Sequence, residues 1–311
     1  MKTCLLVLAF LASAPLFAQE GYIQGYVVTN ENDTIVGLVK NKNSVPYRIL
    51  QEIKFKKEKN SEVQTFAPTE LKGFQIGVDQ YISKKLRLHS AVPILIVDGL
   101  KKYRDDNSNT TAFVKVLAEG DMSYYELRIT GLGTGNEVIY EMLHRKGEDS
   151  LFSVYGLNFQ ERLLAYLSNE PALVEKVKAG VYKRNNLEEL VQEYNLMHYR
   201  PQQTKTGKTA AVNFYTKPNK KLDLYLVVND TVEYRLQDKL LFTVMIPDDV
   251  KSKVCFGTKD NKSCTLISKL AYYTFSEYYE LKVAGNKSKF KIERRSQEEG
   301  QQFVSQNLRP K

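Results

Sequence analysis

Short runs of alternating apolar and polar residues, separated by Gly, Asn, Asp and Pro, fill the chain from residue 21 to about residue 155. The alternation has the two-residue period of a strand with one buried face, and the separating residues favour turns. The sequence therefore predicts a mainly antiparallel β domain here. Its strand candidates are GYIQGYVV, TIVGLVK, QEIKFKK, VQTFA, GFQIGV, TAFVKVL, SYYELRI, EVIYEML and SLFSVY. Residues 83–109 fit the pattern less well and are expected to hold a long loop.

The period then changes to that of amphipathic helices. NFQERLLAYLSN places apolar side chains on one helical face, and its first residue, Asn158, can cap the helix together with Glu161. NEPALVEKVKAG has Pro171 in the first turn and Gly180 at its end, the positions that helices prefer for these residues. A third helix is expected in NLEELVQEYNLMHY. The three helices complete a first domain, residues 19–200.

A second β module follows a polar connector. RPQQTKTGKTA lacks long apolar side chains, so we expect a linker at residues 201–210. Residues 211–292 hold closely spaced strand candidates, as in a small β-sandwich or barrel. They are AVNFYT, LDLYLVV, TVEYRL, LLFTVMI, VCFG, CTLIS, YYELKVA and FKIE. Residues 293–311 read as a polar tail that frays. The expected fold class is mainly β with a three-helix insert, α+β overall.

The first residues read as a secretory signal. MKTCLLVLAFLASAPLFA, residues 1–18, combines an early lysine, an apolar core and a terminal alanine. Cys4 lies inside the apolar core, where it is badly placed to become the lipid-bearing residue of a lipoprotein. The longest later apolar run, residues 91–97, is too short to span a bilayer. We therefore expect an exported protein, periplasmic, outer-membrane-associated or extracellular, without a transmembrane span.

Two cysteines remain after cleavage, Cys255 and Cys264, in VCFGTKDNKSCTL. A turn-rich centre separates two β-like runs, and exported proteins form disulfides. The interpretation we favour is a disulfide across the base of a hairpin; two reduced or buried thiols are the alternative.

Two similar polar tips contain Asn-Asp-Thr, at residues 32–34 and 229–231. Asn and Asp tolerate left-handed backbone angles, so turn chemistry explains both tips as hairpin turns. A second interpretation stays open, because Asp-Thr and Asp-Ser followed by an apolar residue resemble the acceptor triplet of a periplasmic O-glycosylation system. The candidate hydroxyls are those of Thr34, Ser150 and Thr231.

The formal charge of +9 includes Lys2 of the signal, so the mature chain carries about +8 and can attract an anionic partner. The candidate anion-binding residues are Lys54, Lys56, Lys57, Lys84, Lys85, Lys101 and Lys102. Together they can bind a polyanion such as an anionic glycan. Lysines also protect exposed sheet edges, and a solvated surface is the favoured interpretation. Export disfavours nucleic acid as the physiological partner.

Local signatures of catalysis are missing from the sequence. The three histidines are far apart, and neither remaining cysteine has a histidine close to it in sequence. No GxSxG surrounds a serine, and TGKT at residues 206–209 lacks the upstream glycine of a P-loop. We expect neither a cofactor nor a metal. A glycosidase remains the alternative, because two distant carboxylates suffice for it and leave no spacing to read.

The first domain resembles an uncharacterised family of exported β-rich proteins of Gram-negative bacteria, over about residues 21–200. The residues that carry the resemblance are Gly25, Asn32–Ile35, Gly37, Lys40–Asn43, Phe55, Phe66, Pro68 and Lys72–Phe74. They are turn glycines, turn polar residues and sheet aromatics, so the resemblance implies location and architecture only. The second module is weakly similar to small envelope β-sandwich domains. The expectation is a noncatalytic envelope protein, a binding or scaffolding module for a glycan or protein partner; an envelope hydrolase is the alternative.

Overall fold

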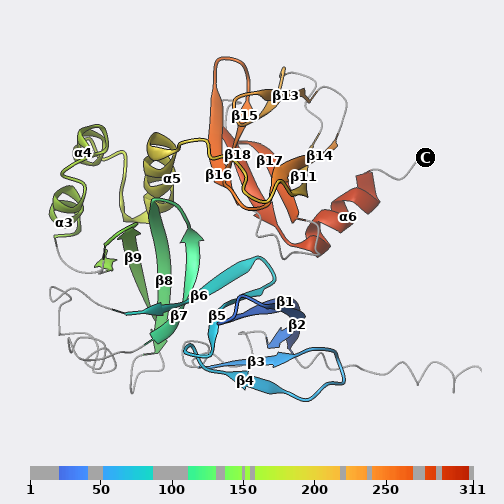
Figure 1. Cartoon of the computed structure of the whole chain (residues 1–311). Coiled ribbons are helices and arrows are strands. Elements are labelled where there is room, and N and C mark those ends of the chain that lie inside the picture. The colour runs from blue at the N-terminus through green and yellow to red at the C-terminus, as the bar shows by residue number, and fades with distance from the viewer. Residues whose placement is uncertain are drawn as a thin grey trace, which may run out of the picture.

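The computed structural model describes residues 21–40, 52–86, 111–130, 137–148, 151–154, 158–217, 222–236, 240–268, 277–284 and 289–307. These residues are mainly β with a few short helices, which confirms the expected class (Figure 1). We call residues 21–198 the single-sheet region and residues 209–307 the two-sheet region. The signal sequence, residues 1–18, and most of the expected long loop lie outside the described residues.

The single-sheet region contains one ten-stranded sheet, in the order β10-β9-β8-β7-β6-β5-β1-β2-β3-β4, and every neighbouring pair is antiparallel. Strands β5 to β10 follow one another as a meander, while β1 to β4 extend the sheet beyond β5. The strands are β1 (Tyr22–Thr29), β2 (Thr34–Lys40), β3 (Ile53–Lys56), β4 (Gln64–Phe66), β5 (Leu71–Ile76), β6 (Asp79–Lys85), β7 (Thr111–Ala118), β8 (Met122–Thr130), β9 (Glu137–Arg145) and β10 (Phe152–Ser153).

Buried side chains of this sheet form three separate clusters. One lies over β1 to β7 and is rich in aromatic residues: the rings of Phe74 and Tyr81 stack with centroids 4.6 Å apart, and Phe113 meets Phe74 edge-on. A second cluster includes Leu127 and Met142. The third joins β8 and β9 to the helices. The long sheet thus has three separate hydrophobic clusters in place of one continuous core.

Three helices cover one face of β8 and β9: α3 (Phe159–Tyr166), α4 (Pro171–Lys178) and α5 (Leu187–His198). Their apolar faces form a cluster with Met122 and Leu143, as the helical period predicts. Asn195 of α5 fixes the helix to the sheet, because its amide accepts from the Met122 N–H and donates to the Met122 carbonyl, both at 2.8 Å. Asn158 precedes α3 in a left-handed conformation and makes no side-chain cap, so the expected capping box does not form.

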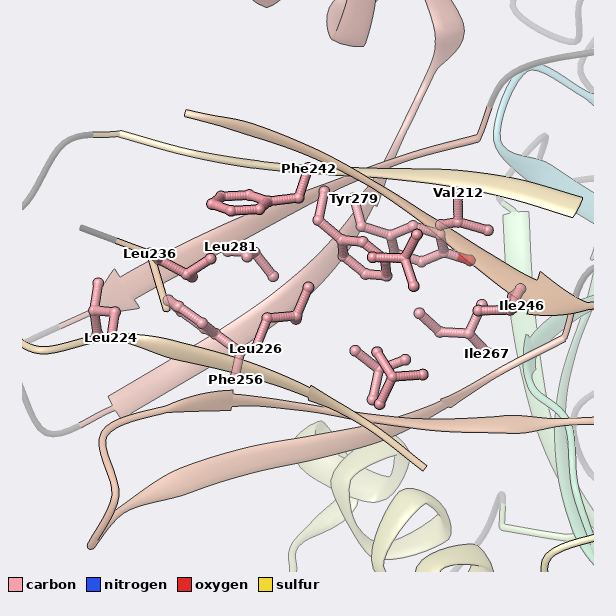
Figure 2. Close-up of a cluster of buried hydrophobic side chains, with 14 of the residues drawn as sticks. Val212, Leu224, Leu226, Leu236, Phe242, Ile246, Phe256, Ile267, Tyr279 and Leu281 are labelled. Atoms are coloured by element: carbon pink, nitrogen blue, oxygen red, sulfur yellow. The ribbon is translucent and has the colours of Figure 1, made fainter. Parts of the chain in front are cut away.

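The two-sheet region contains two four-stranded sheets, β14-β11-β17-β18 and β13-β12-β15-β16. Their strands are β11 (Thr209–Thr216), β12 (Tyr225–Val228), β13 (Val232–Arg235), β14 (Leu241–Pro247), β15 (Ser252–Gly257), β16 (Lys262–Ile267), β17 (Glu277–Ala284) and β18 (Lys289–Arg295). Only β11 and β17 pair in parallel among the pairs described. Side chains of both sheets point into one cluster between them (Figure 2).

The sequence prediction missed strand β6 and helix α6 (Gln297–Asn307). Strand β6 has a single deeply buried side chain, Tyr81, among polar neighbours, so its apolar alternation is too weak to read. Helix α6 occupies the tail that was expected to fray. Phe303 of α6 stacks on Tyr215 at 4.3 Å, and Ser296 and Glu299 bond reciprocally to each other's backbone N–H. That reciprocal pair is a capping box, a signal the sequence did contain.

The connector between α5 and β11 is held against the two-sheet region. The carboxylate of Asp249 accepts from the Thr204 hydroxyl at 2.7 Å and from the Lys205 N–H at 2.6 Å. Asp248 accepts from the Thr206 hydroxyl at 2.8 Å. The TGKT segment is therefore part of a bonded turn, and β11 begins at Thr209, inside the range predicted as linker.

Candidate functional site

The two cysteines lie opposite each other on neighbouring antiparallel strands, Cys255 on β15 and Cys264 on β16, and form a disulfide. Their Cα atoms are 4.0 Å apart. Strand β16 is the last strand of its sheet, so the disulfide attaches this edge strand to the body of the region. The Asn-Asp turns adopt the expected left-handed angles, at Asn32 in one and at Asn229 and Asp230 in the other.

The three candidate glycosylation hydroxyls differ in their surroundings. The Thr34 Oγ1 is buried at the start of β2, so this residue does not offer the exposed hydroxyl that the hypothesis requires. Thr231 is exposed at the β12–β13 turn, where its hydroxyl lies 3.4 Å from the Val228 carbonyl. Ser150 lies outside the described residues. Among the described candidates, the geometry leaves Thr231 as the accessible one.

The described lysines of the anion-binding hypothesis do not form one patch. Lys54, Lys56 and Lys57 lie on or beside β3, whereas Lys84 and Lys85 lie on β6. Strands β5, β1 and β2 separate these two strands, which at about 4.8 Å per strand places them roughly 19 Å apart. Lys84 packs over the Tyr125 ring, and burial lowers its pKa. Lys101 and Lys102 lie outside the described residues.

The two described histidines, His144 and His198, make separate contacts. His144 contacts the Glu148 carbonyl at 2.9 Å, while His198 contacts the Glu170 carboxylate at 3.0 Å and stacks on Tyr194. The first contact stabilises a local turn, and the second joins the end of α5 to the residue that precedes α4. No group of three or more His, Cys, Asp or Glu side chains among the described residues could hold a metal ion. His89 lies outside them.

An open hollow lies where the two regions meet. It is an open cleft of about 350 Å³, within the size range of ligand sites. One wall comes from α5 and from β6 and β7 with the adjoining turns; the other comes from β16, β17 and β18. The lining residues are Val78, Asp79, Gln80, Lys115, Val116, Leu117, Ala118, Glu119, Glu188, Gln192, Asn195, Thr265, Leu266, Ile267, Ser268, Tyr279, Ile292 and Arg294.

Charges of both signs line this cleft. Lys115 forms an ion pair with Asp79 at 2.7 Å. Glu188, in the first turn of α5, accepts a hydrogen bond from Gln192 at 3.2 Å. Desolvation and the neighbouring Glu189 raise the pKa of Glu188, although the residue is exposed at the rim of the cleft. The wall formed by α5 and the sheet thus retains an acidic surplus at Glu188.

A buried ion pair lies beside the cleft, at the contact between the regions. Arg294 of β18 bonds the Glu277 carboxylate at 3.0 Å, and Glu277 is only 7% exposed. The Tyr279 hydroxyl adds a weak contact to Glu277, and Arg294 reaches Gln75 of the single-sheet region at 3.4 Å. Tyr26 lines the small hollow beside this pair, and burial raises its pKa. The adjoining hollow of about 50 Å³ is too small for a ligand.

Further polar contacts hold the two regions together. Lys251 donates to the Glu119 carbonyl at 3.0 Å, and burial lowers the pKa of Lys251. The Tyr199 hydroxyl, just beyond α5, lies 3.2 Å from the Lys251 carbonyl and 3.3 Å from Asn229 Oδ1. These bonds set the position of the cleft walls on both sides of the connector.

Sequence reasoning named none of the cleft residues as candidates. Asp79, Glu188 and Arg294 come from three distant segments, and no spacing connects them. The sequence predicted some of the strands and helices that carry these residues. Their proximity in space, however, depends on how the two regions dock.

Neither a protein family, nor a curated protein, nor a solved structure matches this chain. Among the described residues, no helix has the length and apolar character needed to cross a membrane.

Proposed function

We propose that this chain is a noncatalytic exported cell-envelope protein, a binding or scaffolding module for a glycan or protein partner, with the inter-region cleft as its binding site. The observation that carries the proposal is the open cleft of about 350 Å³, whose two walls come from different β regions. Ligand sites favour such junctions. The secretory pattern of residues 1–18 supports export.

The state of the cleft carboxylates favours binding over catalysis. Asp79 already pairs with Lys115, and Glu188 lies at a solvated rim. A glycosidase needs one carboxylic acid kept protonated in a sheltered pocket and a second carboxylate facing it across the scissile bond. The raised pKa of Glu188 is the one observation that favours the alternative, an envelope hydrolase with Glu188 as its acid.

Affinity capture with a matched pair of variants tests the proposal. The mature chain, immobilised, is exposed to an envelope extract beside Ser268→Trp, which fills the cleft, and Ser305→Trp, which adds the same ring to the exposed surface of α6. We expect a partner that the mature chain and Ser305→Trp retain and that Ser268→Trp loses. Equal retention by all three proteins, or no retention by any, would contradict the proposal.

The hydrolase alternative has its own readout. Release of sugar from an envelope glycan fraction by the mature chain, abolished in Glu188→Gln and retained in Glu189→Gln, would replace the binding proposal with catalysis. We expect no release from any of the three proteins.

A further inference from the structure

Strand β16 presents to the cleft an edge that pairs with no described strand, and α5 and β18 lie beside it as the other cleft walls. It is the terminal strand of its sheet, and its residues Thr265, Leu266 and Ile267 line the cleft together with the following Ser268. At about 3.3 Å per residue, this stretch offers about 13 Å of strand edge. An unpaired edge carries backbone donors and acceptors that can pair with another extended chain.

The register identifies which backbone groups face outward. The Asn229 N–H bonds the Lys253 carbonyl at 2.8 Å, so the backbone of Lys253 is directed toward β12. Lys253 is opposite Leu266, which therefore occupies a non-hydrogen-bonded position and points its own N–H and carbonyl away from β15. The neighbouring Cys255–Cys264 pair, with Cα atoms 4.0 Å apart, has the close spacing of that same class of position.

Within the described part of the chain, no residue bonds the backbone N–H or carbonyl of Leu266. The disulfide two residues earlier, at Cys264, fixes the strand to β15. The edge is therefore both unpaired and held in an extended shape, which lowers the entropy cost of adding a strand.

The lining chemistry suits a polypeptide better than a sugar. Sugar sites commonly present an aromatic face, but the one described aromatic residue of the cleft, Tyr279, is 9% exposed and its hydroxyl contacts Glu277. Three consecutive apolar residues, Val116, Leu117 and Ala118, line the cleft together with polar side chains such as Gln80 and Gln192. A lining of both kinds can receive the apolar and polar side chains of an extended peptide.

The opposite wall indicates the charge of the occupant. Glu188 makes no ion pair with any described residue; desolvation and Glu189 raise its pKa, and the more distant charges of Lys291 and Lys115 offset only part of that rise. A cation brought into the cleft would stabilise the ionised Glu188 and reverse that rise. Asp79 is already compensated by Lys115.

We propose that the cleft binds an extended segment of a partner protein, which adds as a strand to the free edge of β16 through the Leu266 backbone and places a Lys or Arg beside Glu188. This inference rests on the proposed function and names the partner class for the same cleft. The main-chain bonds supply affinity, and the basic side chain supplies selectivity.

Linear peptides selected from a random phage-displayed library against the mature protein provide the probe, with affinity measured by isothermal titration calorimetry. Leu266→Pro removes the outward N–H without removing a bond to β15, since proline is tolerated on the open side of an edge strand. Leu266→Ala keeps the N–H, and Lys262→Pro places proline at an equivalent outward position outside the cleft. We expect Leu266→Pro to weaken binding at least tenfold, and the two controls to stay within about threefold.

A second measurement needs no variant. The amide of Leu266 should exchange rapidly with solvent deuterium in the free protein and slowly with the selected peptide bound, whereas the Thr265 amide is slow in both states. Glu188→Gln should weaken the binding of peptides that carry Lys or Arg about threefold and leave the binding of neutral peptides unchanged.

Several outcomes would overturn the inference. The first is an exchange rate of the Leu266 amide that does not change when peptide binds. The second is an unchanged peptide affinity in Leu266→Pro, provided that the near-ultraviolet circular dichroism of this variant is native. The third is that the library yields no peptide whose binding is lost in Ser268→Trp. If an envelope glycan binds in a manner abolished by Ser268→Trp while no peptide does, the strand-addition inference fails and the proposed binding function stands.

Discussion

In the two-sheet region, side chains of both sheets meet in one cluster that extends from Val212 on β11 to Ile267 on β16. The single-sheet region instead divides its buried side chains among three clusters, and one of them depends on helices α3 to α5. A sheet packed on a second sheet shares one interior, whereas a long single sheet needs separate cover for each part of its faces. The two regions should therefore respond differently to the same kind of damage.

The largest effect is expected from matched core cavities. Phe214→Ala and Phe113→Ala each remove a fully buried ring and should lower the free energy of unfolding by about 4 kcal/mol. In the two-sheet region Phe214→Ala should speed amide exchange in all described strands, because they share one core. Phe113→Ala should speed exchange in β1 to β7 and spare α3 to α5. Hydrogen exchange measured by mass spectrometry checks both expectations. If the two variants speed exchange over equally large parts of their regions, the difference between one shared core and several separate clusters is contradicted.

The contact between the regions comes next. Arg294→Met leaves the buried Glu277 carboxylate without its cation and should cost about 3 kcal/mol in urea unfolding. The double variant Arg294→Met with Glu277→Leu should recover most of that loss, since an apolar pair needs no compensation. Lys282→Met, which breaks an ion pair with Glu293 near the surface of the same sheet, should cost less than about 1 kcal/mol. A loss of the same size in all three variants would contradict this assignment.

The disulfide sharpens the comparison further, because the described single-sheet region has no counterpart to it. Closing a loop with a sequence separation of 9 should stabilise the two-sheet region by about 2.5 kcal/mol. Replacing Cys255 and Cys264 together by Ala should lower the unfolding midpoint of that region in urea. A thiol reductant should reproduce the shift in the unsubstituted protein and leave the variant unchanged; insensitivity of the unsubstituted protein would contradict the expectation.

The smallest effect concerns the two Asn-containing turns. Asn32→Gly keeps the left-handed angle and loses one exposed bond from Lys72, so stability should change by less than about 0.5 kcal/mol. Asn229→Gly also keeps the angle, but it leaves the Lys253 N–H without its acceptor, which should cost about 1 to 2 kcal/mol, while the Tyr199 hydroxyl keeps the Lys251 carbonyl. Thermal unfolding of the two variants in parallel measures the difference. Equal shifts would mean that both residues act only as turn formers.

Much of the secondary structure was predictable from the local pattern. Alternation on β14 is a clear case, since Phe242, Val244 and Ile246 are buried while Thr243 and Met245 are exposed. Helix α4 likewise begins at Pro171, where the first-turn proline predicts it. Strand β6 and helix α6 were missed, because their burial depends on partners elsewhere: Tyr81 on the Phe74 ring and Phe303 on Tyr215.

By itself the sequence determined the mainly β class and the hairpin turns, and it favoured the pairing of Cys255 with Cys264, because residue period and turn chemistry act over a few neighbouring residues. Only the tertiary structure decided that Glu188 of α5, Asp79 of β6 and the open edge of β16 share one cleft. Their distance in space depends on the docking of two separately packed regions, which no spacing along the chain encodes.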